Sequence, residues 1–134
     1  KSIDEDLFYK IFLNEIEGRL PADPFFLIDF PSSFSPLCTP RPDKPYLAQR
    51  FEAYLFGMEL GNGNTENTDT TSVRRVFEEE SKKRQTHPPV DEEFLQALDK
   101  MKAHQYAGMG LGIDRLAMLL ADANDIKQVE PFCV

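Results

Sequence analysis

The pattern of apolar and polar positions predicts short strands alternating with helices along the chain. Apolar residues recur at helical spacing over 2–17, where Ser2 and Glu5 also match a helix capping box. The apolar run over 25–30 is bounded by prolines and is typical of a buried strand. A proline-rich connection over 31–46 follows, and a connection of this length is usually functional or mobile.

Two strands with alternating side chains flank Gly57. Along the first strand, apolar and polar residues face opposite sides: Phe51, Ala53 and Leu55 against Arg50, Glu52 and Tyr54. Along the second strand, Met58 and Leu60 share one face and Glu59 points to the other. We therefore expect Glu52 and Glu59 to lie on the same face of adjacent strands.

The remaining segments add helices and a further strand. Two helices are predicted over 71–85 and 91–101, followed by a strand over 106–112 that opens into a helix over 113–121. Together, these elements predict an α+β fold with a mostly antiparallel sheet flanked by helices.

Glycines occupy alternate positions of the last predicted strand, at Gly108, Gly110 and Gly112. One face of this strand therefore carries no side chains. A strand gives up packing in this way where a ligand or another backbone comes close.

Composition and charge narrow the classes of function. The 134 residues suffice for about one domain, and 41% of them are hydrophobic, which excludes a disordered acidic tail. The 15 basic and 23 acidic residues give a net charge of −8, which argues against a large basic groove for nucleic acid. A cationic small molecule, or a phosphate accompanied by a metal ion, fits this charge better.

Cysteine and histidine usage argues against a zinc site, because Cys38, Cys133, His87 and His104 are not clustered in the sequence. This cysteine usage favours a reduced, cytoplasmic protein. The first residues include no apolar segment typical of a secretory signal, and no window approaches the length of a membrane span. We therefore expect no membrane association.

The segment MELGNGNTENTD, over 58–69, has two interpretations. Asn62 and Gly63 are a strong signal for an ordinary hairpin turn. The glutamates Glu52, Glu59 and Glu66 around this turn favour the floor of a binding site instead.

Carboxylates and one arginine are the candidate chemistry. Two carboxylates that approach each other repel unless a cation joins them, and Mg²⁺ held by one or two carboxylates and substrate phosphates is a common solution. Glu52 and Glu59 are either such a pair or two exposed strand residues. Arg115 begins an apolar helix, where its guanidinium could pair with a carboxylate such as Asp114 or hold phosphate oxygens.

Several segments resemble, in this order, the C-terminal half of a class II aminoacyl-tRNA synthetase catalytic domain of the lysyl type. They are FLIDFPSSFSPL, RFEAYLFGMELGNGNTENTD, a charged helix, a second helix and GMGLGIDRLAML. The last of them, within 106–121, resembles motif 3 of the class: a glycine-rich strand, an arginine and a helix. ELGNG followed by a glutamate points more narrowly to lysine. The resemblance covers nearly all of 1–134 and implies half of the class II sheet.

The resemblance implies an ATP site with Mg²⁺. Glu52 and Glu59 match the family's carboxylates that hold the ATP-bound ion. Arg115 matches the motif 3 arginine, which contacts the ATP phosphates.

The resemblance also implies a lysine site. Asn62 and Glu66 match lysine-binding positions, with Glu66 pairing the side-chain ammonium. In aspartyl relatives the position of Glu66 holds an arginine, which suits an acidic substrate. Gly110 and Gly112 line the amino-acid pocket.

Within the lysyl group, the chain looks most similar to the elongation factor P lysine ligases of the PoxA/GenX type. The similarity lies in HPPVDEEFLQALDKM and in the end of the chain soon after IKQVEPF. Two positions depart: Asn64 stands where phenylalanine is usual, and Gly110 is synthetase-like where the ligase has alanine. The acceptor, tRNA or elongation factor P, is therefore open, and so is the choice between lysine and a lysine analogue.

No segment resembles motif 1, which forms the dimer interface of a homodimer, or motif 2, which supplies an arginine for the α-phosphate. We therefore expect a piece of an ATP-dependent, lysine-activating ligase that is inactive by itself. The alternative is a non-catalytic remnant that serves as a binding or assembly module.

Overall fold

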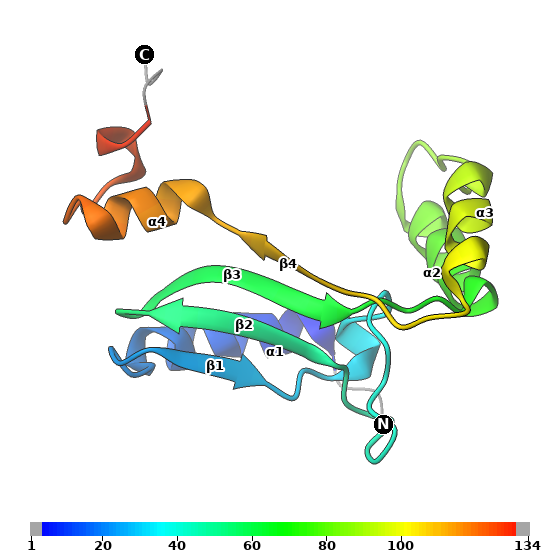
Figure 1. Cartoon of the computed structure of the whole chain (residues 1–134), viewed down its shortest axis with the longest axis horizontal. Helices are drawn as coiled ribbons and strands as arrows, with labels where there is room; N and C mark the ends of the chain where they lie inside the picture. The colour runs from blue at the N-terminus through cyan, green and yellow to red at the C-terminus, as the bar shows by residue number, and fades with distance from the viewer. Residues whose placement is uncertain (1–3, 131–134) are drawn as a thin grey trace. The chain divides into compact units, whose positions relative to one another are not determined.

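The computed structural model of the chain describes residues 4–130. Four strands form one sheet in the order β1 (Phe25–Ile28), β2 (Arg50–Leu55), β3 (Met58–Thr65) and β4 (Ala107–Leu111), with neighbouring strands antiparallel (Figure 1). The α-helices are α1 (Glu5–Ile11), α2 (Thr70–Lys83), α3 (Glu92–Met101) and α4 (Ile113–Leu120). The expected α+β fold, with an antiparallel sheet and helices, is confirmed.

The chain divides into two compact units, which are described separately. The first unit comprises residues 1–27, 51–62 and 109–134, and the second comprises residues 28–50 and 63–108. The first unit holds the turn between β2 and β3 and all of α4, while the second holds the proline-rich loop and the α2–α3 helix pair. Within residues 4–130, no helix is long and apolar enough to cross a membrane.

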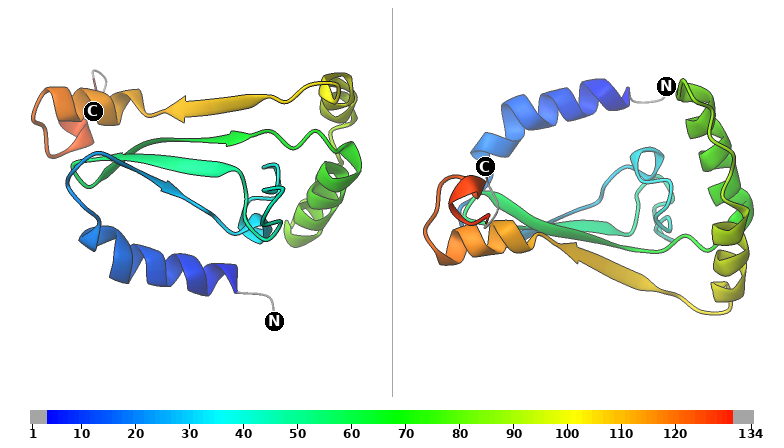
Figure 2. Two further views of the ribbon diagram at one scale, coloured as in Figure 1. Left: turned by 60° about the horizontal axis from the view of Figure 1, so that its bottom comes forward. Right: turned by 90° about the horizontal axis from the view of Figure 1, so that it is seen from above.

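The N-terminal part of the first unit is a helical segment (Figure 2), whose helix type changes along its length. Asp4 caps α1, because its side chain accepts a hydrogen bond from a backbone N–H of the first turn. The segment continues as a π-helix over Phe12–Ile16 and a 3₁₀ turn over Glu17–Arg19. The predicted N-terminal helix is confirmed from Glu5 onward, whereas the predicted capping residue Ser2 lies outside the described residues.

A two-residue turn at Phe56 and Gly57 joins β2 to β3. Both residues take a positive φ, 52° and 74°, as a type I′ turn requires. The Phe56 N–H donates a hydrogen bond to the carbonyl of Ala22 at 3.0 Å, which ties the turn to the segment before β1. Asn62 and Gly63 lie inside β3, so the interpretation that they form the hairpin turn is wrong.

Strand β1 is covered on one face only, so the prediction of a buried strand is wrong. Phe25 stacks on the ring of Tyr54, with 5.1 Å between the ring centroids and 7° between the planes. Phe26 meets Phe51 edge-on but stays 67% exposed, and Ile28 is also exposed. An apolar run in the sequence cannot show which of its faces finds a packing partner.

The second unit has a small core of its own between α2 and α3. Asp69 and Asp91 cap the two helices, each accepting a hydrogen bond from a backbone N–H of the first turn. The inner faces of the helices bring Val73 together with Leu95 and Leu98. Both helices predicted for this region are confirmed.

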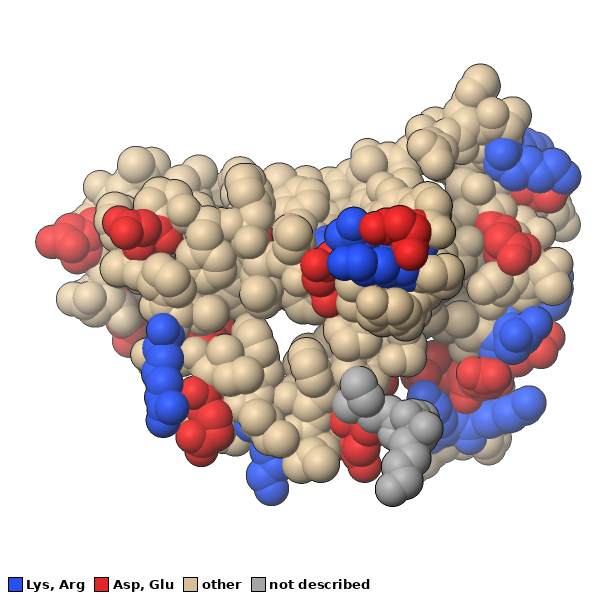
Figure 3. Space-filling view, turned by 90° about the horizontal axis from the view of Figure 1, so that it is seen from below, with Lys and Arg blue, Asp and Glu red and all other residues tan. Residues whose placement is uncertain are grey.

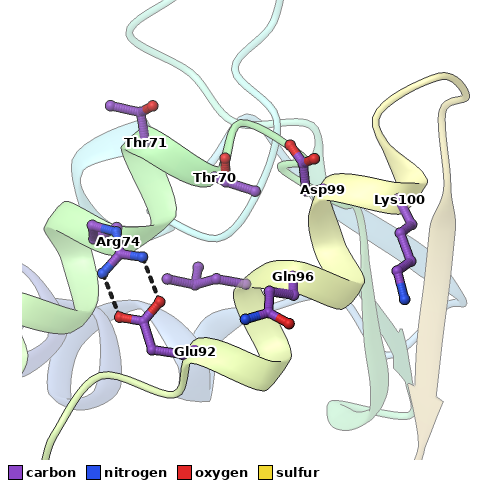
Figure 4. Close-up of a pocket in the computed structure, with 8 residues that line it drawn as sticks. Thr70, Thr71, Arg74, Glu92, Gln96, Asp99 and Lys100 are labelled. Carbon is purple, nitrogen blue, oxygen red and sulfur yellow. Dashed lines mark hydrogen bonds and ion pairs between the residues drawn. The ribbon is translucent and has the colours of Figure 1, made fainter.

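A cavity of about 460 Å³ lies between α2 and α3 (Figure 4). Arg74 donates two hydrogen bonds of 2.6 Å to the carboxylate of Glu92, one to each oxygen. These bonds raise the pKa of Arg74 and lower the pKa of Glu92. The two charges are therefore engaged with each other, and the pair links the helices on their exposed side.

The proline-rich loop ahead of β2 is held at several points along its length. Two isolated backbone bridges pair it with Leu47 and Ala48. Arg41 donates hydrogen bonds to Asp43 at 3.0 and 3.1 Å and to Asp29 at 2.6 Å. On the face of the molecule drawn in Figure 3, basic side chains (blue) also lie next to acidic side chains (red).

Replacing Phe56 by asparagine is expected to stabilise the chain by about 1 kcal/mol. A bulky residue with positive φ is strained, whereas asparagine accepts this conformation readily. Urea denaturation followed by circular dichroism measures the change. Tyr46→Asn is the control, because Tyr46 is equally exposed but has no positive φ, and it should give no gain. A loss of stability in Phe56→Asn would contradict the strain argument.

Candidate functional site

Glu52 and Tyr54 form a buried, hydrogen-bonded pair on β2. The Tyr54 hydroxyl donates to Glu52 Oε2 at 3.2 Å, and the exposed fractions of Tyr54 and Glu52 are 3% and 8%. Burial raises the pKa of Tyr54, followed by the charge and hydrogen bond of Glu52, and the carboxylates of Glu17 and Glu59 add to the increase. Three carboxylates therefore act on one phenol, which stays protonated at neutral pH and serves as a donor.

The pairing register of β3 against β2 shifts by one residue near Glu59. In an unbroken two-residue hairpin, Leu60 would direct its carbonyl toward β2. Instead, this carbonyl accepts a hydrogen bond from the Gly112 N–H at 2.7 Å. Asn62 also reaches Glu59, although side chains three residues apart point to opposite faces of a regular strand. A β-bulge at Glu59 and Leu60 explains both contacts, and the predicted alternation from Met58 to Leu60 is interrupted there.

Glu59 collects the polar contacts at this end of β3. Its carbonyl oxygen accepts a hydrogen bond from Arg115 Nη1 at 2.8 Å, and its Oε2 lies 3.3 Å from the same nitrogen. Its Oε1 accepts a hydrogen bond from Asn62 Nδ2 at 3.3 Å. The structure thus brings together three of the residues that the sequence analysis selected. Glu52 acts on the same neighbourhood, since its charge and that of Glu59 both raise the pKa of Tyr54.

A cavity of about 410 Å³ in the first unit is lined by Glu59 and Arg115. Glu17 adds a second carboxylate to its wall. The rest of the lining is mostly apolar and comes from the β2–β3 turn, α4 and the segment after it: Phe56, Gly57, Met58, Met118 and Ile126. One guanidinium, two carboxylates and an apolar wall suit a phosphorylated organic molecule that binds together with a cation.

The donor set fits Mg²⁺ when a ligand supplies further oxygens. Glu52 and Glu59 offer the hard oxygen donors that Mg²⁺ prefers, and proteins usually hold this ion by one or two carboxylates, phosphates and water. In the described part of the chain, no group of three or more His, Cys, Asp or Glu side chains could hold a metal ion by itself. The assignment of Mg²⁺ to these two glutamates therefore stays a prediction that depends on a phosphate-bearing ligand.

Among Gly108, Gly110 and Gly112, the predicted close approach of another backbone is found only at Gly112, and a tighter approach lies at Gly61 on β3. A Cβ atom at Gly61 would overlap the carbonyl oxygen of Gly110 on β4. A Cβ atom at Gly112 would lie 3.3 Å from the Leu60 carbonyl oxygen, whereas Gly110 itself faces open space. Gly61 is therefore required by the pairing of β3 with β4, Gly112 lies in a tight space beside Leu60, and Gly110 leaves space that a ligand can use.

Glu66 directly follows β3 and belongs to the second unit, and both its backbone N–H and its carbonyl are hydrogen-bonded. Its N–H donates to the Tyr106 carbonyl at 2.8 Å, and its own carbonyl accepts from the Thr39 hydroxyl at 2.7 Å. Burial raises the pKa of Cys38, and the Glu66 carboxylate contributes to the increase. A Cβ atom at Gly108 would lie 3.8 Å from Glu66 Oε1, so the glycine leaves room beside this carboxylate.

Comparison with protein families gives a match over most of the chain. Residues 12–134 match the model described as "tRNA synthetases class II (D, K and N)". The chain belongs to this family. The resemblance carried by the glycine-rich strand and the arginine that follows it is therefore confirmed at the level of the class II synthetases.

Lysine–tRNA ligases are among the relatives of this class II synthetase chain. The enzyme of Chloroflexus aurantiacus is 39% identical over 134 residues, covering 96% of this chain and 26% of the relative. The enzyme of Anaeromyxobacter sp. (strain K) is 41% identical over 118 residues, covering 84% of this chain and 23% of the relative. The enzyme of Saccharolobus solfataricus is 37% identical over 116 residues, covering 83% and 23%. The chain thus spans about a quarter of the length of these relatives.

Three residues of the candidate site were missed by the sequence analysis. Tyr54 carried a usable signal, because a residue two positions from Glu52 on a strand must share its face. Gly61 sits in the same segment as the residues that were selected, yet only the strand pairing shows that it lies against Gly110. Glu17 carried no signal, since the chain brings it to the cavity from a helical segment far from the motifs.

Replacing Gly61 by valine is expected to lower the free energy of unfolding by about 1–3 kcal/mol, because the new side chain overlaps the Gly110 backbone. Gly110→Val is the matched control and should change this free energy by less than about 0.5 kcal/mol, since its site is open. Urea denaturation of both variants measures the difference. Equal effects of the two substitutions would contradict the close approach of β3 to β4 in the class II fold.

Proposed function

We propose that this chain is part of an ATP-dependent, lysine-activating enzyme and carries one portion of its lysine and ATP sites. The reaction joins the lysine carboxylate to the α-phosphate of ATP, releases pyrophosphate, and then transfers the lysyl group from the adenylate to an acceptor. Membership in the class II family and similarity to lysine–tRNA ligases support the proposal. Residues 1–134 then correspond to the C-terminal portion of the catalytic domain, with motif 3 over 106–121.

The observation that carries the proposal is the contact between Arg115 and Glu59. A guanidinium and a carboxylate that line one cavity supply the two charges that a metal-bound polyphosphate needs. Arg115 is also bonded to the Glu59 carbonyl oxygen. This backbone bond would keep the guanidinium in place when the carboxylate turns toward a cation.

The residues of the chain would act by positioning and by charge. Arg115 offers hydrogen-bond donors to phosphate oxygens, as the phosphates gain charge during adenylate formation. Glu52 and Glu59 would hold Mg²⁺, which neutralises phosphate charge when bound. The lysine carboxylate is the nucleophile and is already ionised at neutral pH, so the reaction needs no general base.

Glu66 is our proposed partner for the side-chain ammonium of lysine. An ammonium group taken out of water needs a carboxylate, and the space beside Glu66 Oε1 at Gly108 supports this role. Asn62, Gly110 and Gly112 are proposed as further lysine-binding positions, and the open space at Gly110 supports its part in this assignment.

The acceptor that we propose is tRNA, because relatives that cover most of this chain are lysine–tRNA ligases. Elongation factor P is the alternative acceptor, because the segment HPPVDEEFLQALDKM resembles the ligases of the PoxA/GenX type. The 134 residues by themselves are expected to give at most slow lysine-dependent ATP–pyrophosphate exchange, since no segment among them resembles motif 2.

Glu66→Gln is expected to abolish lysine binding by the chain and to leave Mg²⁺–ATP binding nearly unchanged. Leaving the ammonium unpaired costs roughly 3–5 kcal/mol, or more than a hundredfold in Kd. NMR titrations of the isotope-labelled chain with lysine and with Mg²⁺–ATP measure both. Glu79→Gln, the same change on an exposed position of α2, is the matched control and should keep both affinities. Lysine binding that is indifferent to Glu66→Gln would contradict the assignment.

Arg115→Ala is expected to give the reverse pattern, with Mg²⁺–ATP binding weakened at least tenfold and lysine binding almost unchanged, because a charged contact to phosphate is lost. The same titrations measure it. Binding of neither ligand by the unchanged chain would overturn the proposed function and favour a non-catalytic binding or assembly module.

A further inference from the structure

We propose that Tyr54 is a positioning residue for the Glu52 carboxylate and thereby sets how tightly the chain binds the divalent cation of its ATP site. The inference rests on the proposed function, in which Glu52 and Glu59 hold that cation. Tyr54 would not touch the ion or the nucleotide. Its hydroxyl would act through the orientation of the carboxylate that does.

The contact between Tyr54 and Glu52 is shielded from water. The Tyr54 hydroxyl donates to Glu52 Oε2 at 3.2 Å, and both residues are buried. Because a hydrogen bond to an ionised acceptor gains strength away from water, this bond restricts the rotation of the carboxylate. One oxygen of Glu52 is therefore held at a defined place.

The aromatic ring that carries this hydroxyl is itself fixed. Phe25 of β1 lies parallel to the Tyr54 ring, with 7° between the planes and 5.1 Å between the centroids. A tyrosine side chain has few rotatable bonds, so stacking on one face leaves little freedom to the hydroxyl. The placement of Glu52 thus depends on β1 as well as on β2.

The hydrogen bond from Tyr54 determines where the Glu52 carboxylate can stand. A donor that is fixed in space limits the rotation of this carboxylate, so its oxygens keep defined positions. Groups that orient a metal ligand typically change metal affinity by about 10–100-fold when they are removed.

The alternative role for Tyr54 is purely structural, as a ring that fills the space against Phe25. Tyr54→Phe separates the two roles, because it keeps the ring and removes only the oxygen. A structural role predicts no change in cation binding, whereas a positioning role predicts a loss that appears only when the cation is present.

The experiment measures the affinity of the 134-residue chain for ATP by calorimetry, once with Mn²⁺ as the probe cation and once with a chelator. The ratio of the two affinities is the gain due to the cation. We expect Tyr54→Phe to reduce this gain about 10–100-fold and to leave the affinity for ATP alone unchanged. Glu52→Gln should remove the gain, and Tyr46→Phe, which deletes an exposed hydroxyl, should not alter it.

The outcomes separate the inference from the function on which it rests. One outcome is that the unchanged chain shows an increase in ATP affinity with Mn²⁺ and that Tyr54→Phe keeps this increase in full. That result would overturn the positioning role and leave the proposed function intact. An equal loss with and without Mn²⁺ would show a general structural defect and would also overturn it. Absence of any gain in the unchanged chain would overturn both, and this failure is recognised without any variant.

Discussion

The one-residue offset of β3 at Glu59 and Leu60 is the constraint on which the site depends. It turns the Leu60 carbonyl toward Gly112, directly before α4, and leaves the Glu59 carbonyl to Arg115 in the first turn of that helix. It also lets Asn62 reach the Glu59 carboxylate. A regular hairpin would separate these groups onto opposite faces, so the bulge gathers in one place the polar residues of β3 and the arginine of α4.

Two glutamates of the site differ in burial. Glu52 is buried and accepts a hydrogen bond from the Tyr54 hydroxyl, and Glu59 is partly exposed and accepts hydrogen bonds from Arg115 and Asn62. A buried carboxylate needs hydrogen-bond donors to offset its desolvation cost. A partly exposed one can exchange its partner for a ligand more readily. The difference suits a site with one fixed and one adjustable carboxylate.

The sequence predicts the elements of this fold well and their surroundings less well. Both helices of the second unit and the β4–α4 segment follow from periodicity and capping residues, which act locally. Pairing between strands decides the rest. Asn62 and Gly63 carry a strong turn signal, yet the turn forms at Phe56 and Gly57, because contacts with Ala22 and the flanking strands outweigh the local preference.

The candidate site shows the same division between local and distant information. The prediction that Glu52 and Glu59 lie on the same face of adjacent strands was drawn from strand alternation, which the bulge at Glu59 and Leu60 interrupts, and it stays a prediction. The contact between Glu59 and Arg115 could not be predicted from the sequence, because 56 residues separate them and no sequence pattern indicates the bulge. Glu17 was not predicted either, because it is also far from Glu59 and Arg115 in the sequence. Burial of β1 was overestimated, since an apolar run does not show whether both faces are covered.

The exposure of many large apolar side chains has a thermodynamic consequence. Among residues 4–130, Val73 is the largest side chain with almost no exposed surface, while Leu7, Phe26 and Leu120 keep much of their surface in water. The heat capacity of unfolding follows the apolar area that unfolding exposes, and it is about 12–15 cal/mol/K per residue in ordinary domains. This chain has less apolar area left to expose, so its heat capacity change should fall below that range. Its free energy of unfolding then changes less steeply with temperature than that of an ordinary domain.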